Sequence, residues 1–229
     1  FFFMLGGLVY SLTYRGLAPL TTAGLNALQI GASIEAVLLS LALADRITTM
    51  RRQREEARRA ERRALRLAVS DQLSGLYNAR HFWNRLEAEV TAMRQMEQPL
   101  SVLILDVDNF KSYNDAHGHP EGDRVLARLG EVIRGSIREE DHGCRYGGEE
   151  FAVILPGSTV EEARVVAERI RKGLEDQRFT PAGADAVRVT VSIGAAQLAP
   201  GQSPKELVTR ADHALYQAKA QGKNQVKGA

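Results

Sequence analysis

The chain has 229 residues, of which 44% are hydrophobic and 25% are charged, a composition that fits one folded domain of ordinary size plus an additional segment. The formal net charge of +2 gives no strong case for a nucleic-acid partner, and none is expected. The single cysteine, Cys144, excludes an internal disulfide and fits a reducing compartment, where we expect a small buried residue rather than a catalytic thiol. The chain begins with Phe1 rather than methionine, so we expect a fragment of a longer protein.

Two apolar stretches at the N-terminus predict transmembrane helices. Residues 1–14 carry no charge, and residues 23–44 carry only Glu35. The second stretch is long enough to span a bilayer, since about 20 apolar helical residues cross the hydrocarbon core. A turn between the two stretches is indicated by Gly16, Pro19, Thr21 and Thr22. We therefore predict a truncated, multi-pass membrane domain over residues 1–45.

The charges in and after the second stretch bear on its role and orientation. An ionisable group in the middle of a span is costly unless it faces other helices. Glu35 is therefore either a packing or signalling contact within a bundle, or a neutral, hydrogen-bonded glutamic acid without a signalling role. Nine arginines lie between Arg46 and Arg66, and positive charge beside a span marks the cytoplasmic side. We expect an inner-membrane protein whose C-terminal domain faces the cytoplasm. Residues 35–46 resemble the last span of the bacterial seven-helix receptors that carry diverse intracellular signalling modules.

Residues 46–70 predict a helical connector. The segment has no Gly or Pro and is rich in Arg, Glu, Ala and Leu, which are good helix formers. A seven-residue seam can be drawn through Ile47, Met50, Arg54, Ala57, Glu61, Ala64 and Ala68. Because few of these positions hold a large apolar side chain, the coiled-coil pattern is weak. We predict a parallel dimeric helix that acts as a signalling connector; a plain solvated helix is the alternative.

Strand and helix patterns alternate in the remaining residues 71–229. Buried or paired strands are predicted at 100–107, at 145–155 as a hairpin around a glycine turn, and at 187–198. Helices are predicted at 81–94, 121–138, 159–174 and 204–220. This alternation favours an α/β or α+β layer fold with one sheet.

Four acids lie where two of these strand elements end. Asp106 and Asp108 close the first strand, and their side chains share a face only while the strand stays extended. Glu149 and Glu150 lie at the hairpin turn, so a hairpin that pairs beside the first strand brings Asp106 and one glutamate together. Oxygen ligands gathered at a strand end suit Mg²⁺, with a nucleotide phosphate completing its coordination. Any one of these acids, taken alone, could be an ordinary solvated loop carboxylate. That alternative explains the occurrence of all four together less well.

The sequence Gly147-Gly148-Glu149-Glu150-Phe151 resembles the GGDEF or GGEEF signature of diguanylate cyclases. Other blocks resemble the same family in order along the chain: Asp71-Gln-Leu-Ser-Gly75-Leu-Tyr-Asn78, Asp106-Val-Asp108-Asn-Phe110-Lys111, Asn114-Asp115, Gly118-His119, Gly122-Asp123, Val191-Ser-Ile-Gly194 and Ala211-Asp212-x-Ala-Leu-Tyr-x-Ala-Lys219. The resemblance runs from Asp71 to the C-terminus. It implies a central, mostly antiparallel sheet flanked by helices, related to polymerase palm and nucleotidyl cyclase domains.

The same resemblance implies a metal site with two Mg²⁺ or Mn²⁺ ions. Asp106, the Val107 carbonyl and Glu149 would hold the metals, with Glu150 beside them as a second catalytic carboxylate. Glu149 would be either the base or a metal-bound activator of the attacking hydroxyl, and these two roles stay open. Gly147 and Gly148 permit a tight turn and a close approach of the backbone to the substrate.

The implied substrate is GTP. Asn114 and Asp123 match the positions that read the guanine edge, which an amide and a carboxylate can pair. Lys111, Lys219 and Lys223 match the positions that bind phosphates; at Lys223 many relatives carry Arg, whose bidentate fork Lys lacks. Phe110 and Asp115 belong to the same nucleotide-binding run.

The implied reaction joins two GTP molecules into cyclic di-GMP with release of two pyrophosphates. Because each domain binds one GTP, the active unit would be a twofold homodimer. Arg138 and Asp141 match the family's inhibitory RxxD site, completed by Arg169, where cyclic di-GMP would bind as an inhibitor. Two rivals are a non-catalytic module that senses cyclic di-GMP or GTP and an enzyme that makes another cyclic dinucleotide. The intact Gly147–Phe151 signature argues against the non-catalytic module, and Asp123 argues against an enzyme that makes another cyclic dinucleotide.

Overall fold

The computed structural model describes residues 1–19, 21–181 and 185–229, and the side chains of these residues apart from 24, 25 and 58–68. The chain divides into two compact units, Phe1–Ala64 and Leu65–Ala229. Each unit is described by itself.

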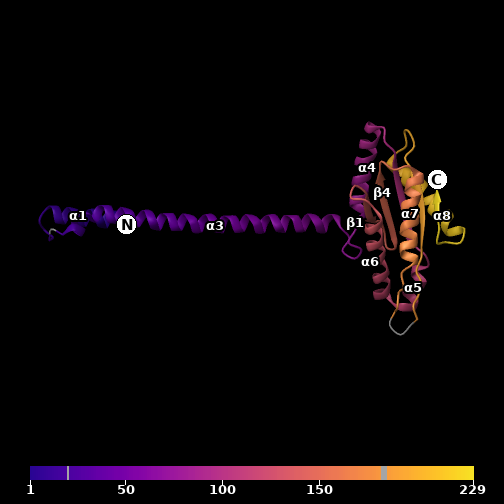
Figure 1. Ribbon diagram of the computed structural model, residues 1–229, viewed down its shortest axis with the longest axis horizontal. Helices are drawn as coiled ribbons and strands as arrows, with labels where there is room; N and C mark the ends of the chain where they lie inside the picture. The colour runs from indigo at the N-terminus through magenta and orange to yellow at the C-terminus, as the bar shows by residue number, and fades with distance from the viewer. Residues whose placement is uncertain (20, 182–184) are drawn as a thin grey trace. The chain divides into compact units, whose positions relative to one another are not determined.

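The N-terminal unit is helical. Helix α1 (Phe2–Tyr14) is followed by the single turn α2 (Thr22–Leu25) and by α3 (Ala27–Val69), whose 43 residues run without a break through the predicted span and the predicted connector (Figure 1). The helical character of the connector is therefore confirmed. Three positions of the predicted coiled-coil seam, Glu61, Ala64 and Ala68, lie outside the described side chains.

Helices α1 and α3 approach each other closely at two glycines. A Cβ on Gly6 would lie 2.3 Å from the Ala27 carbonyl oxygen, and a Cβ on Gly31 would lie 2.4 Å from the Phe2 carbonyl oxygen. Among the described residues, one helix, Ala27–Ala57, is long and apolar enough to cross a membrane, whereas Phe2–Tyr14 is a shorter apolar helix. Length and composition thus support one possible span, and the several spans expected from the sequence are not established.

The C-terminal unit is built on one mixed sheet with the strand order β1-β3-β4-β2-β5-β6. The strands are β1 (Tyr77–Asn78), β2 (Leu100–Val107), β3 (His142–Arg145), β4 (Glu150–Pro156), β5 (Val191–Gln197) and β6 (Val226–Gly228). The three central pairings are antiparallel, and the two edge pairings, β1 with β3 and β5 with β6, are parallel. A mostly antiparallel sheet is therefore confirmed, and so are the predicted buried strand and hairpin.

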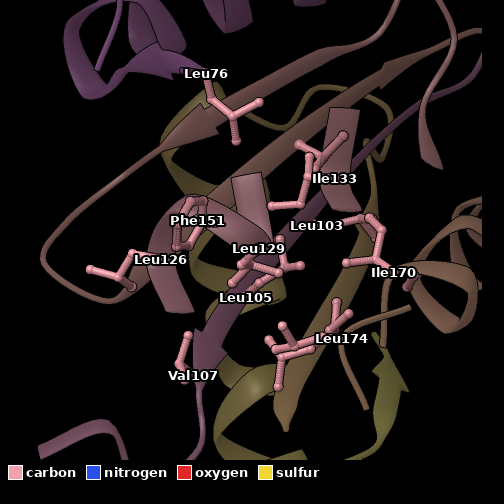
Figure 2. Packing of buried hydrophobic residues seen from close by; sticks show 14 of the residues in the cluster. Leu76, Leu103, Leu105, Val107, Leu126, Leu129, Ile133, Phe151, Ile170 and Leu174 are labelled. Carbon is pink, nitrogen blue, oxygen red and sulfur yellow. The ribbon is translucent and has the colours of Figure 1, made fainter. Parts of the chain in front are cut away.

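Helices cover both faces of this sheet (Figure 1). The helices are α4 (Ala79–Met96), α5 (Phe110–His117), α6 (His119–Ser136), α7 (Val160–Glu175) and α8 (Pro204–Ala220). Side chains alternate along β2, so Leu103, Leu105 and Val107 pack with α5, α6 and α7, as Figure 2 shows in part. Val102 and Ile104 pack on the opposite face with α4 and α8. This alternation makes two hydrophobic layers and leaves the end of β2 between them.

Several element boundaries differ from the sequence prediction, and two of the differences have a cause that the structure shows. The helix expected at 121–138 begins earlier, and a separate helix, α5, precedes it across Gly118, whose φ of +84° ends one helix before the next begins. The strand expected at 187–198 begins only at Val191. Val187 pairs instead with Phe179 through hydrogen bonds of 3.0 and 2.7 Å, because β2 has no residues left to pair with it. Cys144 is fully buried, and burial raises the pKa of its thiol to about 12, as suits a structural cysteine.

Candidate active site

The end of β2 lies beside the start of β4, and this register brings the predicted acids together. Asp106 is the direct partner of Glu150 in the antiparallel ladder. The Val107 N–H donates to the Glu149 carbonyl at 3.4 Å. The expected convergence of Asp106 with a glutamate of the hairpin is therefore confirmed.

Burial and like charge make this group of carboxylates costly to ionise. Asp106 is only 6% exposed, and burial raises the pKa of its carboxyl even though the ammonium of Lys219 lies 2.8 Å away. The pKa of Glu149 is also raised, first by burial and then by the charge of Asp106. Negative charges held together in this way are the setting in which a divalent cation binds well, because the cation offsets both repulsion and desolvation.

The donor set is small. Within the described ranges, no group of three or more His, Cys, Asp or Glu side chains is placed to hold a metal ion. The predicted set comprises two carboxylates, Asp106 and Glu149, and one main-chain carbonyl, that of Val107, and it stays a prediction. Hard oxygen donors of this kind fit Mg²⁺ or Mn²⁺, which keep water or phosphate oxygens in their remaining positions.

The hairpin turn is held by a residue that the sequence did not single out. The guanidinium of Arg145 donates to the Gly148 carbonyl at 3.1 and 2.7 Å and to the carboxylate of Asp71 at 3.2 Å. A Cβ on Gly147 would lie 2.6 Å from a carboxylate oxygen of Glu150, so glycine leaves room for that side chain. Arg145 directly precedes the turn, but its pairing with a residue 74 positions away is not visible in the sequence.

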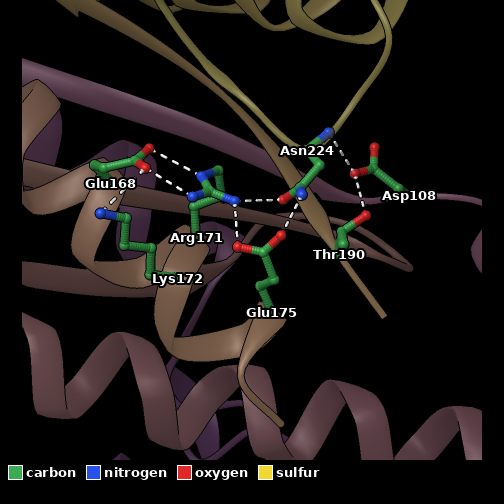
Figure 3. Close-up of polar contacts among 7 residues, drawn as sticks. All are labelled: Asp108, Glu168, Arg171, Lys172, Glu175, Thr190 and Asn224. Carbon is green, nitrogen blue, oxygen red and sulfur yellow. Dashed lines mark hydrogen bonds and ion pairs between the residues drawn. The ribbon is translucent and has the colours of Figure 1, made fainter. Parts of the chain in front are cut away.

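Asp108 has a different surrounding from Asp106. Because β2 ends at Val107, Asp108 leaves the strand and its carboxylate accepts hydrogen bonds from the Thr190 hydroxyl at 2.8 Å, the Ser192 hydroxyl at 2.7 Å and the Asn224 N–H at 3.0 Å. The contacts to Thr190 and Asn224 are drawn in Figure 3. Asp108 therefore fastens neighbouring elements, and its oxygens have protein partners.

The residues expected to read guanine lie on two successive helices. The Oδ1 atom of Asn114, on α5, is buried and has no hydrogen-bond partner among the described residues. Gly122, on α6, faces this amide so closely that a Cβ there would lie 1.8 Å from Oδ1. Asp123 follows Gly122 and is exposed. A buried acceptor without a partner beside an exposed carboxylate is an arrangement that a ligand with several N–H donors would satisfy.

The other predicted substrate residues fall into two groups. Lys111 and Asp115, on α5, are exposed, whereas Phe110 is 7% exposed and packs in the core. Lys219 stands at the end of α8, and the exposed Lys223 in the following loop donates to the Asn109 side chain. Two cationic side chains thus flank the end of β2, which is where phosphates of a metal-bound nucleotide would lie.

The predicted inhibitory residues lie near one another, away from the end of β2. The Arg138 N–H donates to the Asp141 carboxylate at 2.8 Å. Burial raises the pKa of Asp141, an effect opposed by this hydrogen bond and by the charge of Arg169. Arg138 and Asp141 line a surface pocket of about 460 Å³, together with Arg134 and Tyr77. Arg169 instead donates to the Ser136 carbonyl at 2.5 Å.

Known proteins share this unit. Residues 68–225 match the family described as "Diguanylate cyclase, GGDEF domain". The response regulator PleD of Caulobacter vibrioides is 43% identical over 167 residues, which are 72% of this chain and 37% of that protein. The chain therefore spans little more than a third of that curated relative. The diguanylate cyclase DgcS of Shewanella oneidensis is 35% identical over 219 residues, which are 96% of this chain and 67% of that protein.

Solved structures agree with the sequence relatives. The coiled coil and GGDEF domain of DgcB from Caulobacter crescentus, solved in complex with cyclic di-GMP, superimposes with a TM-score of 0.73 at 30% identity and covers 83% of this chain and 99% of that one. The diguanylate cyclase SiaD of Pseudomonas aeruginosa, solved with its activator SiaC, gives a TM-score of 0.67 at 31% identity over 99% of this chain and 96% of that one. The family predicted from the sequence is confirmed: the chain belongs to the GGDEF-domain diguanylate cyclases.

Proposed function

We propose that this chain is a diguanylate cyclase that condenses two GTP molecules into cyclic di-GMP and two pyrophosphates. The observation that carries the proposal is the register of β2 and β4, which sets Asp106 opposite Glu150 and beside Glu149 at a glycine turn. Family membership and the intact Gly147–Phe151 signature support the same conclusion.

A divalent metal site belongs to this proposal. Asp106, Glu149 and the Val107 carbonyl would hold two Mg²⁺ or Mn²⁺ ions. When bound, the ions would lower the pKa of the 3′-hydroxyl of one GTP and neutralise the pyrophosphate leaving from the other. Burial raises the pKa of Asp106 and of Glu149, and a bound cation would offset the cost of ionising these buried carboxyls. Lys219 supplies part of the positive charge beside these carboxylates. Together with Lys223 and Lys111, it would also bind the triphosphate.

Guanine selectivity would come from Asn114 and Asp123. The unpartnered Oδ1 of Asn114 accepts an N–H, and Asp123 accepts further ones. Guanine offers N1–H and N2–H₂ donors on one edge, whereas adenine carries no N–H at the corresponding ring nitrogen. Leaving a buried acceptor unpaired costs binding energy, so this pair of residues favours GTP over ATP.

Cyclisation requires two such domains, because each provides one GTP site. We therefore propose a twofold homodimer, with α3 as the connector that sets how often the two half-sites meet. The crystal structure of DgcB, which contains a coiled coil and a GGDEF domain, is consistent with this role. Inhibition by bound cyclic di-GMP at Arg138, Asp141 and Arg169 is part of the same proposal, and the structures of DgcB in complex with cyclic di-GMP support the choice of ligand.

Membrane attachment is proposed for the N-terminal unit. Ala27–Ala57 is long and apolar enough to span, and its arginine-rich continuation favours a cytoplasmic cyclase domain. The seven-helix receptor context and a multi-pass arrangement at the inner membrane stay predictions from the sequence.

The direct test is conversion of GTP by the full chain in detergent with Mg²⁺, with the product identified by mass. Glu149→Gln should abolish product, whereas Glu87→Gln, an exposed carboxylate on α4, should leave the rate unchanged. Product formation that survives Glu149→Gln would refute the site assignment, and loss of activity in both variants would indicate damage to the fold.

A further inference from the structure

The loop that follows α8 holds a lysine in a backbone conformation that lysine does not favour. Gly222, Lys223 and Asn224 all have positive φ, at +115°, +64° and +46°. Glycine and, to a lesser degree, asparagine adopt this region more readily than other residues, so Lys223 is the disfavoured one of the three. The loop nevertheless carries Lys223, one of the phosphate-binding residues of the proposed function. Contacts from elsewhere in the fold must therefore hold it.

Those contacts converge on Asn224. Its N–H donates to the Asp108 carboxylate at 3.0 Å, its Oδ1 accepts from the Arg171 guanidinium at 2.7 Å, and its Nδ2 donates to the Glu175 carboxylate at 2.7 Å (Figure 3). Every polar group of the side chain is used, and the partners come from two different elements. Asn224 is thus the point at which the loop is fastened to the domain.

Arg171, on α7, is shaped for this contact. The residue is 8% exposed, and its guanidinium donates to both carboxylate oxygens of Glu168 at 2.9 and 2.7 Å and to Glu175 at 2.8 Å, besides Asn224. Four directed hydrogen bonds from one planar group fix its orientation, which a lysine could not reproduce. Glu168 and Glu175 therefore hold Arg171, and Arg171 with Glu175 holds Asn224.

The other side of the network reaches the catalytic strand. Asp108, which accepts the Asn224 N–H, lies two residues after Asp106, and Asn109, between the strand and α5, accepts from the Lys223 ammonium. One chain of contacts therefore joins α7, the loop and the end of β2. It sets the position of Lys223 relative to the Asp106 carboxylate.

We propose that Arg171 is a positioning residue for catalysis, which holds Lys223 where the phosphates of the nucleotide bind. The inference rests on the proposed function, since it presumes that Lys223 binds a nucleotide triphosphate. Arg171 itself is separated from the substrate by Asn224 and acts only through the loop.

The test compares Arg171→Gln with Lys172→Gln in the full chain. Lys172 is the adjacent residue on α7, its side chain is 65% exposed, and its ion pair with Glu168 is long, at 4.0 Å. Arg171→Gln should raise KM for GTP by about tenfold to a hundredfold, because displacement of a positioning contact by about 1 Å can cost that much. Lys172→Gln should leave KM unchanged. Arg171→Lys, which keeps the charge without the fork, should resemble Arg171→Gln.

A double-variant cycle distinguishes positioning from general destabilisation. If Arg171 acts through Lys223, adding Arg171→Gln to Lys223→Ala causes little further rise in KM. An equal additional loss in both backgrounds would overturn the proposal, and so would an unchanged KM in Arg171→Gln alone. Thermal unfolding checks each variant, and Asn224→Ala, which removes the same contact from the loop side, replaces Arg171→Gln should that variant not fold.

A binding measurement separates this inference from the proposed function. The probe is a GTP analogue with a methylene group between its α and β phosphorus atoms, which cannot release pyrophosphate. Binding by the wild-type chain without cyclic di-GMP formation from GTP would refute only the proposed function. Equal affinity of the wild-type chain and Arg171→Gln for the analogue would refute only the positioning role, and absence of wild-type binding would refute both.

Discussion

Replacement of Gly122 by alanine should damage guanine recognition while leaving the fold intact. The added Cβ would lie 1.8 Å from Oδ1 and 2.9 Å from Cγ of Asn114, and 3.1 Å from Cζ of Phe110. Contacts this short with two atoms of one amide cannot be absorbed by the backbone of α6, which is packed on the core. The Asn114 side chain must therefore leave its present position, in which Oδ1 is buried against Gly122.

The expected magnitude follows from what Asn114 would contribute. One or two hydrogen bonds to guanine, at about 0.5–1.5 kcal/mol each, correspond to a rise in KM for GTP of about twofold to 150-fold. Stability changes less, because an overpacking cost of about 1–3 kcal/mol is offset by about 1 kcal/mol from the better helix propensity of alanine.

Gly135→Ala is the matched control on the same helix. A Cβ there meets no atom within 4 Å, so this variant should be stabilised by up to about 1 kcal/mol with an unchanged KM. Steady-state kinetics with GTP and thermal unfolding of the two variants decide the matter. A Gly122→Ala protein with wild-type KM for GTP would show that Asn114 does not read the base.

Three further predictions follow from the charges around the turn. Arg145→Lys should lower kcat/KM about tenfold and reduce stability by about 1–2 kcal/mol, because lysine cannot bridge the Gly148 carbonyl and Asp71 at once. Steady-state kinetics measures the first effect, and urea unfolding measures the second. Asp106→Asn should abolish activity yet not destabilise the metal-free protein at pH 7. Because the folded-state pKa of Asp106 is raised, ionising this carboxyl lowers the stability of the wild-type protein as pH rises above the ordinary Asp range. The variant should lose this pH dependence of stability, as measured by urea unfolding at several pH values. Because the pKa of Glu149 is raised, kcat/KM at limiting Mg²⁺ should begin to fall on acidification at a pH above the ordinary carboxyl range. A kcat/KM that does not change down to pH 4 would contradict this role of Glu149.

Local sequence pattern was sufficient for the elements that carry the proposed chemistry. An apolar run ending at Asp106, and two strand runs separated by Gly147 and Gly148, predict a buried strand beside a hairpin. The side-chain period of two then predicts that an acid of one strand can face an acid of the other. The structure adds the register, in which Asp106 faces Glu150 rather than Glu149.

Contacts between distant segments could not be predicted in this way. Asp108 binds Ser192, 84 residues away, and Asn224, 116 residues away, and nothing in the local pattern distinguishes it from Asp106. Gly118 illustrates a second limit. It ends one helix and begins another because its φ is +84°, whereas glycine within a helical pattern does not reveal its dihedral angles.

The two aspartates at the end of β2 differ in how easily their partners can be exchanged, and this difference fits two different roles. The partner of Asp106 is the ammonium of Lys219, a flexible side chain that is 37% exposed and that solvent, phosphate or a metal ion could replace. Asp108 is held by two hydroxyls and a main-chain N–H, and losing them would leave a buried charge unpaired. A metal site needs a carboxylate whose partner can leave, and a phosphate-binding loop needs one whose partners cannot. Asp106, the last residue but one of β2, and Asp108, the first residue after the strand, provide these two kinds of carboxylate.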